Sequence, residues 1–246
     1  MVVGERRGEV GVVRLERPER RNALTEGMLE GLSAEVGRQV SGGARAVLLC
    51  GAGPVFCAGF DMAAVLDEPA RLGGLLRGLA GVVRGLRLSP VPVVIAAHGA
   101  AIAGGCALLC GGDVVVTEAG ARLGYPVVRL GISPAVTGPG LGASAGWGPA
   151  RERLLDPGLI GGAAAVRAGI AHECAADAAA CLARAGAVAQ ELARKPAGAL
   201  DATKALLAEL DGSMDEGRAR LALGVSLGLV GGDEQARLVA AAWSKA

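Results

Sequence analysis

Hydrophobic and polar positions follow two periods along the first half of the chain. Residues 9–15 alternate between polar and apolar side chains, which predicts a strand with one buried face. Short apolar runs bounded by Gly or charged residues predict strands buried on both faces, and these are 44–51, 91–99 and 113–118. Residues 121–128 are expected to be extended. Helical spacing, with Thr25 as a plausible N-cap for the first segment, is found at 26–40, 70–88 and 104–110.

Strands and helices therefore alternate through the first half, which is typical of an α/β fold with parallel strands. From about residue 179 onward the pattern is helical only. The stretch 131–150 is uncharged and rich in Gly and Pro, which predicts a loop or a broken helix. We expect two parts, an α/β core over residues 1–178 and a helical C-terminal segment over residues 179–246.

Composition and charge narrow the class of protein. The chain has 246 residues and a formal net charge of +1, so nothing favours binding to nucleic acid or to an anionic membrane. Only two His are present, and the six Cys lack the spacing of a zinc site, so we expect no metal. Six Cys in a chain of this length, without an apolar leader, predict free thiols and a cytoplasmic location.

One long uncharged stretch has the length of a membrane span. Residues 88–112 contain no Asp, Glu, Lys or Arg. Pro90 and Pro92 open the stretch, His98 interrupts it, and several Gly break it. A buried strand, a Gly turn and a buried helix fit this pattern better, so we expect no membrane segment.

Two Gly-containing turns offer the first indication of chemistry. Each follows a predicted buried strand and opens a helix, the first at 57–61 and the second at 103–106. Such turns leave backbone N–H groups without partners. Two N–H groups aimed at one point form an oxyanion hole, which stabilises an enolate or a tetrahedral oxygen. A single Gly turn in so Gly-rich a chain is more often a plain tight turn.

Four blocks of sequence, taken together, favour an oxyanion hole over two plain tight turns. They are "RPERRNALT", "GAGPVFCAGFDM", "AAHGAAIAGGCALLCGGDVVVTEAGARLGYPVVRLGISP" and "AGIAHEC". In this order and spacing they resemble the crotonase superfamily, the enoyl-CoA hydratase/isomerase family, over roughly residues 9–235. The resemblance implies a spiral ββα core, a C-terminal helical oligomerisation segment that forms homotrimers or dimers of trimers, and acyl-CoA thioester substrates. Coenzyme A then enters as part of the substrate, with no permanently bound cofactor.

The resemblance also assigns the candidate site residues. The N–H groups of Phe60 and Gly104 would form the oxyanion hole. The loop "PERRNAL" would hold the CoA nucleotide and pantetheine, and Arg side chains suit phosphate oxygens. The first turn adds further candidates for substrate binding. The full set of substrate-binding candidates is Arg20, Arg21, Ala23, Leu24, Ala58, Gly59 and Asp61.

The sequence departs from the family pattern where acid–base chemistry is expected. Family hydratases carry one Glu after the second turn and another after a Pro, and these positions are Ala107 and Val127 here. An Asp used by some members is replaced by Ala135. Ala and Val transfer no protons, and positioned acid–base groups each contribute about 10²–10⁴ in rate. The usual two-glutamate mechanism is therefore doubtful.

Several other residues are candidates to replace the missing carboxylates. Ser133 and Thr137 are placed to orient a water. Asp61 is more often structural, and a nucleophilic Cys57 is the less favoured interpretation. We expect packing or structural roles for His98 and Tyr125, and surface or helix-end charges at Glu118 and Glu173.

Two classes of function remain open. The first is an enzyme of the hydratase/isomerase type, in fatty acid metabolism, that keeps enolate stabilisation; decarboxylation of a malonyl-type thioester and thioester hydrolysis are variants of it. The second is an acyl-CoA-binding or partner subunit without chemistry. Retention of both Gly turns favours ligand binding in either class.

Overall fold

The central sheet has six strands in the order β1-β2-β3-β4-β6-β8, and only the β1–β2 pair is antiparallel. The computed structural model describes residues 1–243. A second sheet pairs β5 with β7 in parallel. The strands are β1 (Val2–Arg7), β2 (Val10–Leu15), β3 (Ala46–Gly51), β4 (Val93–Ala97), β5 (Ala100–Ile102), β6 (Val114–Glu118), β7 (Arg122–Gly124) and β8 (Glu173–Ala175).

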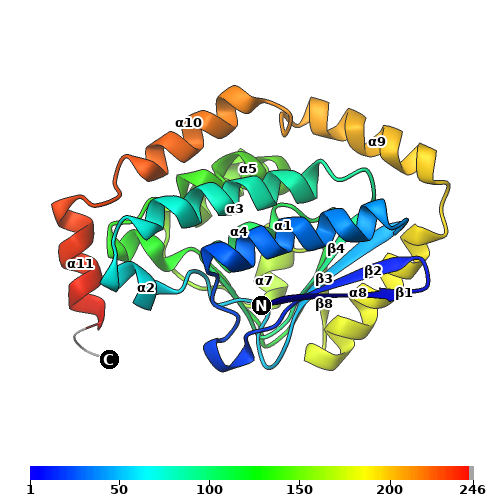
Figure 1. The fold of residues 1–246 in the computed structure, drawn as a ribbon, viewed down its shortest axis with the longest axis horizontal. Coiled ribbons are helices and arrows are strands. Elements are labelled where there is room, and N and C mark those ends of the chain that lie inside the picture. The colour runs from blue at the N-terminus through cyan, green and yellow to red at the C-terminus, as the bar shows by residue number, and fades with distance from the viewer. Residues whose placement is uncertain (244–246) are drawn as a thin grey trace.

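Helices follow most strands, as the alternating pattern predicted, and Figure 1 shows the mixed α/β architecture. Thr25 caps the first helix as expected, because its side chain accepts a hydrogen bond from the Met28 N–H. The helices are α1 (Glu26–Ser41), α2 (Met62–Asp67), α3 (Arg71–Arg87), α4 (Gly104–Leu109), α5 (Gly138–Ala145), α6 (Trp147–Leu155), α7 (Gly162–Arg167), α8 (Ala178–Ala193), α9 (Ala197–Leu210), α10 (Glu216–Leu227) and α11 (Asp233–Trp243). Three 3-10 turns are η1 (Pro18–Arg20), η2 (Pro126–Leu130) and η3 (Pro134–Thr137).

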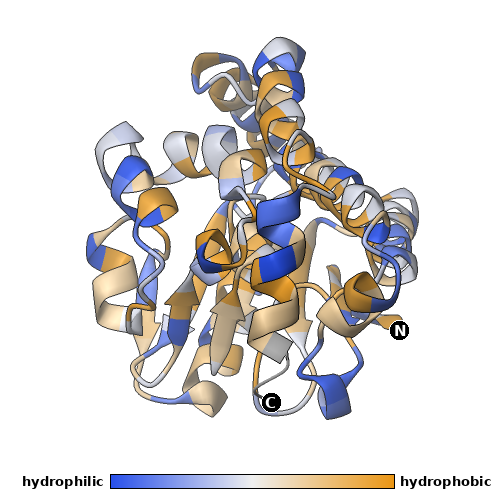
Figure 2. Ribbon diagram, turned by 90° about the vertical axis from the view of Figure 1, so that its left-hand side faces the viewer, coloured by the Kyte–Doolittle hydropathy of each residue, from blue (hydrophilic) through white to orange (hydrophobic). Residues whose placement is uncertain are grey.

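Both faces of the central sheet are buried. All six residues of β3 are buried, and they alternate between two clusters. Val47 and Leu49 pack with the apolar residues of α1 and α3, whereas Ala46 and Leu48 pack with those of α8. Successive strand side chains point to opposite faces, so α8 covers the face opposite to α1 and α3. Figure 2 shows the apolar strands inside a shell of helices that carry both polar and apolar residues.

The helix α8 belongs structurally to the core, although it lies in the segment predicted over 179–246. Its buried residues Cys181, Ala185 and Ala189 pack on the sheet. A helical pattern of apolar residues shows that one face is buried but not what buries it. The stretch 131–150 forms η3, α5 and the start of α6, so the broken helix that we expected is present.

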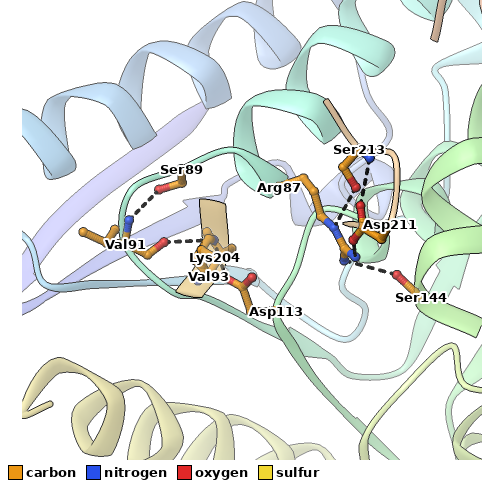
Figure 3. A network of polar contacts seen from close by, with 9 residues as sticks. All are labelled: Arg87, Ser89, Val91, Val93, Asp113, Ser144, Lys204, Asp211 and Ser213. Atoms are coloured by element: carbon orange, nitrogen blue, oxygen red, sulfur yellow. Dashed lines mark hydrogen bonds and ion pairs between the residues drawn. The ribbon is translucent and has the colours of Figure 1, made fainter. Parts of the chain in front are cut away.

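The helices α9 and α10 run along the outside of the molecule as an arm (Figure 1). Polar contacts tie this arm to the core (Figure 3). Lys204 pairs with Asp113 and donates to the Val91 carbonyl at 3.2 Å, and Arg87 pairs with Asp211. Large apolar side chains on the arm and the adjoining turns are exposed; they are Leu206, Leu207, Leu210, Met214, Leu221, Val225 and Leu229.

No helix within residues 1–243 is long and apolar enough to cross a membrane. The uncharged stretch 88–112 instead supplies β4 and α4, the strand and helix that we expected, and between them the short strand β5, which we did not expect. Within the same described part of the chain, no group of three or more His, Cys, Asp or Glu is placed to hold a metal ion.

Candidate active site

The two Gly turns lie side by side because a short parallel pairing joins them. Cys57 pairs with Ala101, the Cys57 N–H donates to the Ala100 carbonyl at 3.0 Å, and the Ile102 N–H donates to the Cys57 carbonyl at 3.0 Å. Phe60 and Gly104 each follow this pair by three residues, so the two turns leave from adjacent, parallel segments. The two turns touch, since a Cβ on Gly104 would lie 3.0 Å from Phe60 Cε1.

The N–H groups of these two residues are both without a backbone partner. Leu24 uses its N–H and carbonyl to bond Gly59 and Asp61, at 2.7 and 2.9 Å, so the Phe60 N–H faces away from Leu24. Gly104 is the first residue of α4, where the helix offers its N–H no acceptor. Within residues 1–243, neither N–H donates a backbone hydrogen bond. Both are therefore available to an oxygen atom in front of the turns.

A cavity of about 650 Å³ opens in front of both turns. It collects most of the site residues predicted from the sequence. Those that line it are Arg20, Arg21, Ala23, Ala58, Phe60, Asp61, Gly104, Ala107, Val127, Ser133 and Thr137. Leu24 and Gly59 are not among the lining residues: both are buried, and they pair with each other behind the turn.

The cavity is apolar inside and has positive charge at its edge. Exposed Arg20, Arg21 and Arg129 line it, and none forms an ion pair within the described residues. Such charge attracts anionic groups. The only acid among the lining residues, Asp61, pairs with Arg17 (Nη1–Oδ2 2.7 Å). The apolar lining includes Met62, Leu76, Leu79, Ile102, Leu130, Ile132 and Val136.

Ala107 and Val127 face the space in which the resemblance implied carboxylates. Both residues line the cavity, Ala107 from α4 and Val127 from η2. Their side chains offer neither a base nor an acid. Proton transfer at these two points would therefore need a group from the substrate or the solvent.

The two hydroxyl candidates differ in their surroundings. Ser133 caps η3, because its Oγ accepts from the Ala135 N–H at 3.2 Å. Thr137 is buried, lines the cavity, and forms no hydrogen bond through its hydroxyl within the described residues. Thr137 is thus a buried hydroxyl in the lining that is free to donate and to accept, whereas Ser133 Oγ already accepts one bond.

Three residues for which we favoured structural roles are buried and make contacts that fit those roles. Cys57 is fully buried, its Sγ donates to the Asn22 carbonyl, and burial raises the pKa of the thiol to about 12, which rules against a nucleophile. His98 is buried outside the cavity lining, with Nε2 3.0 Å from the Gly53 carbonyl oxygen. Tyr125 donates to the Cys106 carbonyl at 3.3 Å, and burial raises its pKa well above the usual value.

The expectation for Glu118 was wrong, whereas that for Glu173 is confirmed. Glu118 is buried and accepts hydrogen bonds from the N–H groups of Gly99 and Gly120, at 3.0 and 2.9 Å. The two Gly N–H groups stabilise the carboxylate at the end of β6, so the side chain folds inward. Glu173 forms a surface ion pair with Arg184.

Sequence reasoning missed two residues next to the site. Asn22 is fully buried and has a left-handed backbone conformation (φ 55°). Arg17 bonds both Asp61 and the Ala23 carbonyl. The signal for Asn22 was the type of residue, since Asn tolerates positive φ better than other non-Gly residues. Arg17 opens the block "RPERRNALT", but nothing in that block showed that its side chain would reach Asp61.

Comparison with known proteins identifies the family that this chain resembles. The family model described as enoyl-CoA hydratase/isomerase matches residues 5–221. A Thermus thermophilus protein that carries an enoyl-CoA hydratase name is 36% identical over 222 residues, which is 88% of this chain and 87% of that protein. The short-chain-enoyl-CoA hydratase of Clostridium acetobutylicum is 33% identical over 177 residues, or 70% and 67% of the two chains. An enoyl-CoA hydratase/isomerase structure from Xanthobacter autotrophicus Py2 has a TM-score of 0.88 at 25% identity and covers 99% of this chain and 93% of that one.

Proposed function

The chain belongs to the enoyl-CoA hydratase/isomerase family, as its motifs indicated, and on that premise we propose that it binds acyl-CoA thioesters and stabilises their enolates. The thioester oxygen accepts hydrogen bonds from the N–H groups of Phe60 and Gly104. The observation that carries this proposal is the parallel pairing of Cys57 with Ala101, which brings together two residues with unpartnered N–H groups, Phe60 and Gly104, in the lining of one cavity.

The two kinds of cavity lining match the two parts of such a substrate. Exposed Arg20 and Arg21 suit the phosphates of coenzyme A. The apolar residues suit a hydrocarbon acyl group, and coenzyme A arrives as part of the substrate, with no permanently bound cofactor. In this proposal the pantetheine arm of the substrate runs along Ala23, Ala58 and Asp61, between the arginines and the apolar part of the lining.

The chemistry of this site is hydratase/isomerase-like, with an oxyanion hole as its main catalytic device. Charge that develops on the thioester oxygen is stabilised by two fixed donors, and the loss of one such donor typically lowers the rate about 10²–10³-fold. The Thr137 hydroxyl is free to orient a water, with Ser133 beside it on η3. The cytoplasm and acyl-CoA metabolism, such as that of fatty acids, are the proposed setting.

One observation favours a second candidate within the same fold. The only acid that lines the cavity, Asp61, is already paired with Arg17. Decarboxylation of a malonyl-type thioester needs no protein base: the bond between Cα and the carboxylate breaks, CO₂ leaves, and the electron pair forms the enolate held by the hole. A proton from solvent water then reaches Cα. A binding subunit without chemistry is the alternative that the absence of any turnover would favour.

The exposed apolar side chains of the arm support a homo-oligomer. Leu210 and Leu221 are 74% and 72% exposed, and Leu206, Leu207 and Val225 on the same two helices are exposed as well. Large apolar side chains left exposed along two helices suit an interaction surface. We propose a homotrimer, or a dimer of trimers, formed through the C-terminal helices.

The substrate class is tested by binding first and turnover second. We expect butyryl-CoA to bind, as measured by calorimetry, and we expect consumption of either crotonyl-CoA or methylmalonyl-CoA, followed by chromatography. Binding without turnover of any thioester would favour the non-catalytic subunit. No binding at all would overturn the proposal.

Restoring the missing carboxylates tests the mapping of the site. We expect the double variant Ala107→Glu/Val127→Glu to hydrate crotonyl-CoA about 10²-fold faster than the wild type, because it gains a base and an acid. The matched control is Ala107→Gln/Val127→Gln, which adds the same bulk without proton transfer. If folded Glu and Gln variants have equal rates, the assignment of these two positions is wrong.

A further inference from the structure

We propose that Asn22 is a positioning residue, which holds the Phe60 N–H in line with the Gly104 N–H by clamping the segment 52–56 that leads into the first turn. This inference rests on the proposed function. It adds that the loop 17–24, proposed to bind coenzyme A, and the first half of the oxyanion hole form one rigid unit.

The clamp consists of the Asn22 side-chain amide. Its Nδ2 donates to the carbonyl oxygens of Ala52, Val55 and Phe56, at 2.8, 2.9 and 3.1 Å. Its Oδ1 accepts from the Arg17 N–H at 2.9 Å. The Nδ2 group has two hydrogens, so at least one of them is shared between two of these carbonyl oxygens; the acceptors on this side and the Arg17 N–H on the other fix the orientation of the amide. One side chain thus joins the start of the loop to the segment before the turn.

The residue type fits this task closely. Asn22 is fully buried with φ at 55°, a conformation that few residues other than Gly and Asn adopt at low cost. It is also the only asparagine in the chain. Gly would keep the backbone but lose the amide, and Gln would move the amide out of reach. The position therefore calls for both properties of Asn together.

Further bonds between the loop and the turn lie on both sides of Phe60. The Ala58 N–H donates to the Arg21 carbonyl at 3.0 Å, and Leu24 bonds Gly59 and Asp61. Arg17 pairs with Asp61 directly after Phe60. The peptide that carries the Phe60 N–H is thus bonded to the loop immediately before and after it.

The segment 52–56 needs such support, because it has no regular structure. Gly53 and Pro54 are exposed, and the segment is neither helix nor strand. Carbonyl groups that are removed from water and lose their hydrogen-bond partner destabilise the fold, so without the amide the segment would rearrange towards water. An N–H group in the hole must stay within a narrow range of distance and angle to polarise the thioester carbonyl.

The test separates alignment of the hole from binding of coenzyme A. Butyryl-CoA has the thioester carbonyl, and its thioether analogue S-butyl-CoA lacks that oxygen, so the ratio of their affinities measures the hole. Two hydrogen bonds predict a ratio of about ten in the wild type. In Asn22→Asp, which has the same shape but no amide donors, we expect the ratio to fall to about one while S-butyl-CoA binds within about twofold of wild type.

The carbonyl stretch of bound butyryl-CoA, labelled with ¹³C, provides a second readout. We expect hydrogen bonding to lower this frequency in the wild type and the shift to be largely lost in Asn22→Asp. The control is Gln190→Glu, the same chemical change at an exposed residue of α8, which should leave both readouts unchanged. Should Asn22→Asp fail to fold, Asn22→Gly keeps the positive φ and gives the same comparison.

Two different outcomes would overturn the inference. A folded Asn22 variant with the wild-type ratio and frequency would show that the hole does not depend on the clamp. Equal losses of affinity for butyryl-CoA and S-butyl-CoA would show that Asn22 only supports the loop. A wild-type ratio of one would instead refute the oxyanion hole, and with it the proposed function.

Discussion

The two turns in front of the cavity each present one N–H, but the structure fixes them in opposite ways. The first turn, at 57–61, is hydrogen-bonded to the loop 17–24 through backbone groups, and two side chains add to this: Arg17 pairs with Asp61, and Asn22 bonds the segment just before the turn. The second turn, at 103–106, is held by close backbone contact. A Cβ on Gly105 would lie only 2.4 Å from the Cys57 carbonyl oxygen.

This difference predicts which substitutions each turn tolerates. The first turn depends on groups that are present, so it should be sensitive to the removal of hydrogen-bonding side chains. The second turn depends on the lack of a side chain at Gly105, so it should be sensitive to added atoms. Cores are packed too tightly to absorb even one extra methyl group against the backbone without strain.

The largest effect is expected from an added methyl group in the second turn. We expect Gly105→Ala to lower the free energy of unfolding by about 3 kcal/mol, because the new Cβ collides with the Cys57 backbone, which has no room to move. Urea denaturation followed by circular dichroism measures this change.

The matched control is the same substitution at Gly81, an exposed position within α3 where a Cβ meets nothing within 4 Å. There we expect a gain of about 0.5–1 kcal/mol, because Ala favours the helix over Gly. If Gly105→Ala were as stable as Gly81→Ala, the two turns would not be in close contact.

A second prediction uses one buried thiol from each turn. Burial raises the pKa of Cys57 and of Cys106 to about 12, so both stay protonated in the folded protein when the unfolded chain has lost those protons. Stability is therefore fully present below about pH 9 and falls as the pH rises towards 12. We expect each thiol to contribute a loss of about 1.4 kcal/mol per pH unit in that range.

Urea denaturation at several alkaline pH values measures this slope. Other groups titrate in the same range, so the comparison is with the double variant Cys57→Ala/Cys106→Ala, in which the slope should be smaller by the share of two thiols. An unchanged slope would mean that the thiols are exposed to water before the protein unfolds.

The sequence predicted the strands and turns that form this site better than the side-chain contacts that hold them in place. Apolar runs placed β3, β4 and β6, and motif order placed Phe60 and Gly104, because both signals are local in the chain. The support from Asn22 depends on carbonyl groups about thirty residues away, which no local pattern encodes. The burial of the Glu118 side chain was missed for the same reason, because its hydrogen-bond partner Gly99 follows a different strand, β4.

The smallest effect is expected where the second turn itself carries strain. Ala103 has φ 53° and ψ −113°, a conformation that costs a residue with a Cβ about 1–3 kcal/mol. Its backbone is held in place, because its N–H donates to the Gly124 carbonyl and its carbonyl accepts from Ala107. We expect Ala103→Gly to raise the free energy of unfolding by about 1 kcal/mol, as relief of strain exceeds the added freedom of Gly in the unfolded chain.

Urea denaturation measures this gain, and the ¹³C carbonyl frequency of bound butyryl-CoA shows whether the hole keeps its shape. An unchanged frequency with higher stability would mean that backbone bonds alone set the position of Gly104. Lower stability would instead show that the Ala103 methyl group packs usefully against the first turn, where a Cβ on Gly59 would approach it to 3.2 Å. In that case the second turn, like the first, would depend on a side chain, and the contrast between them would be one of degree.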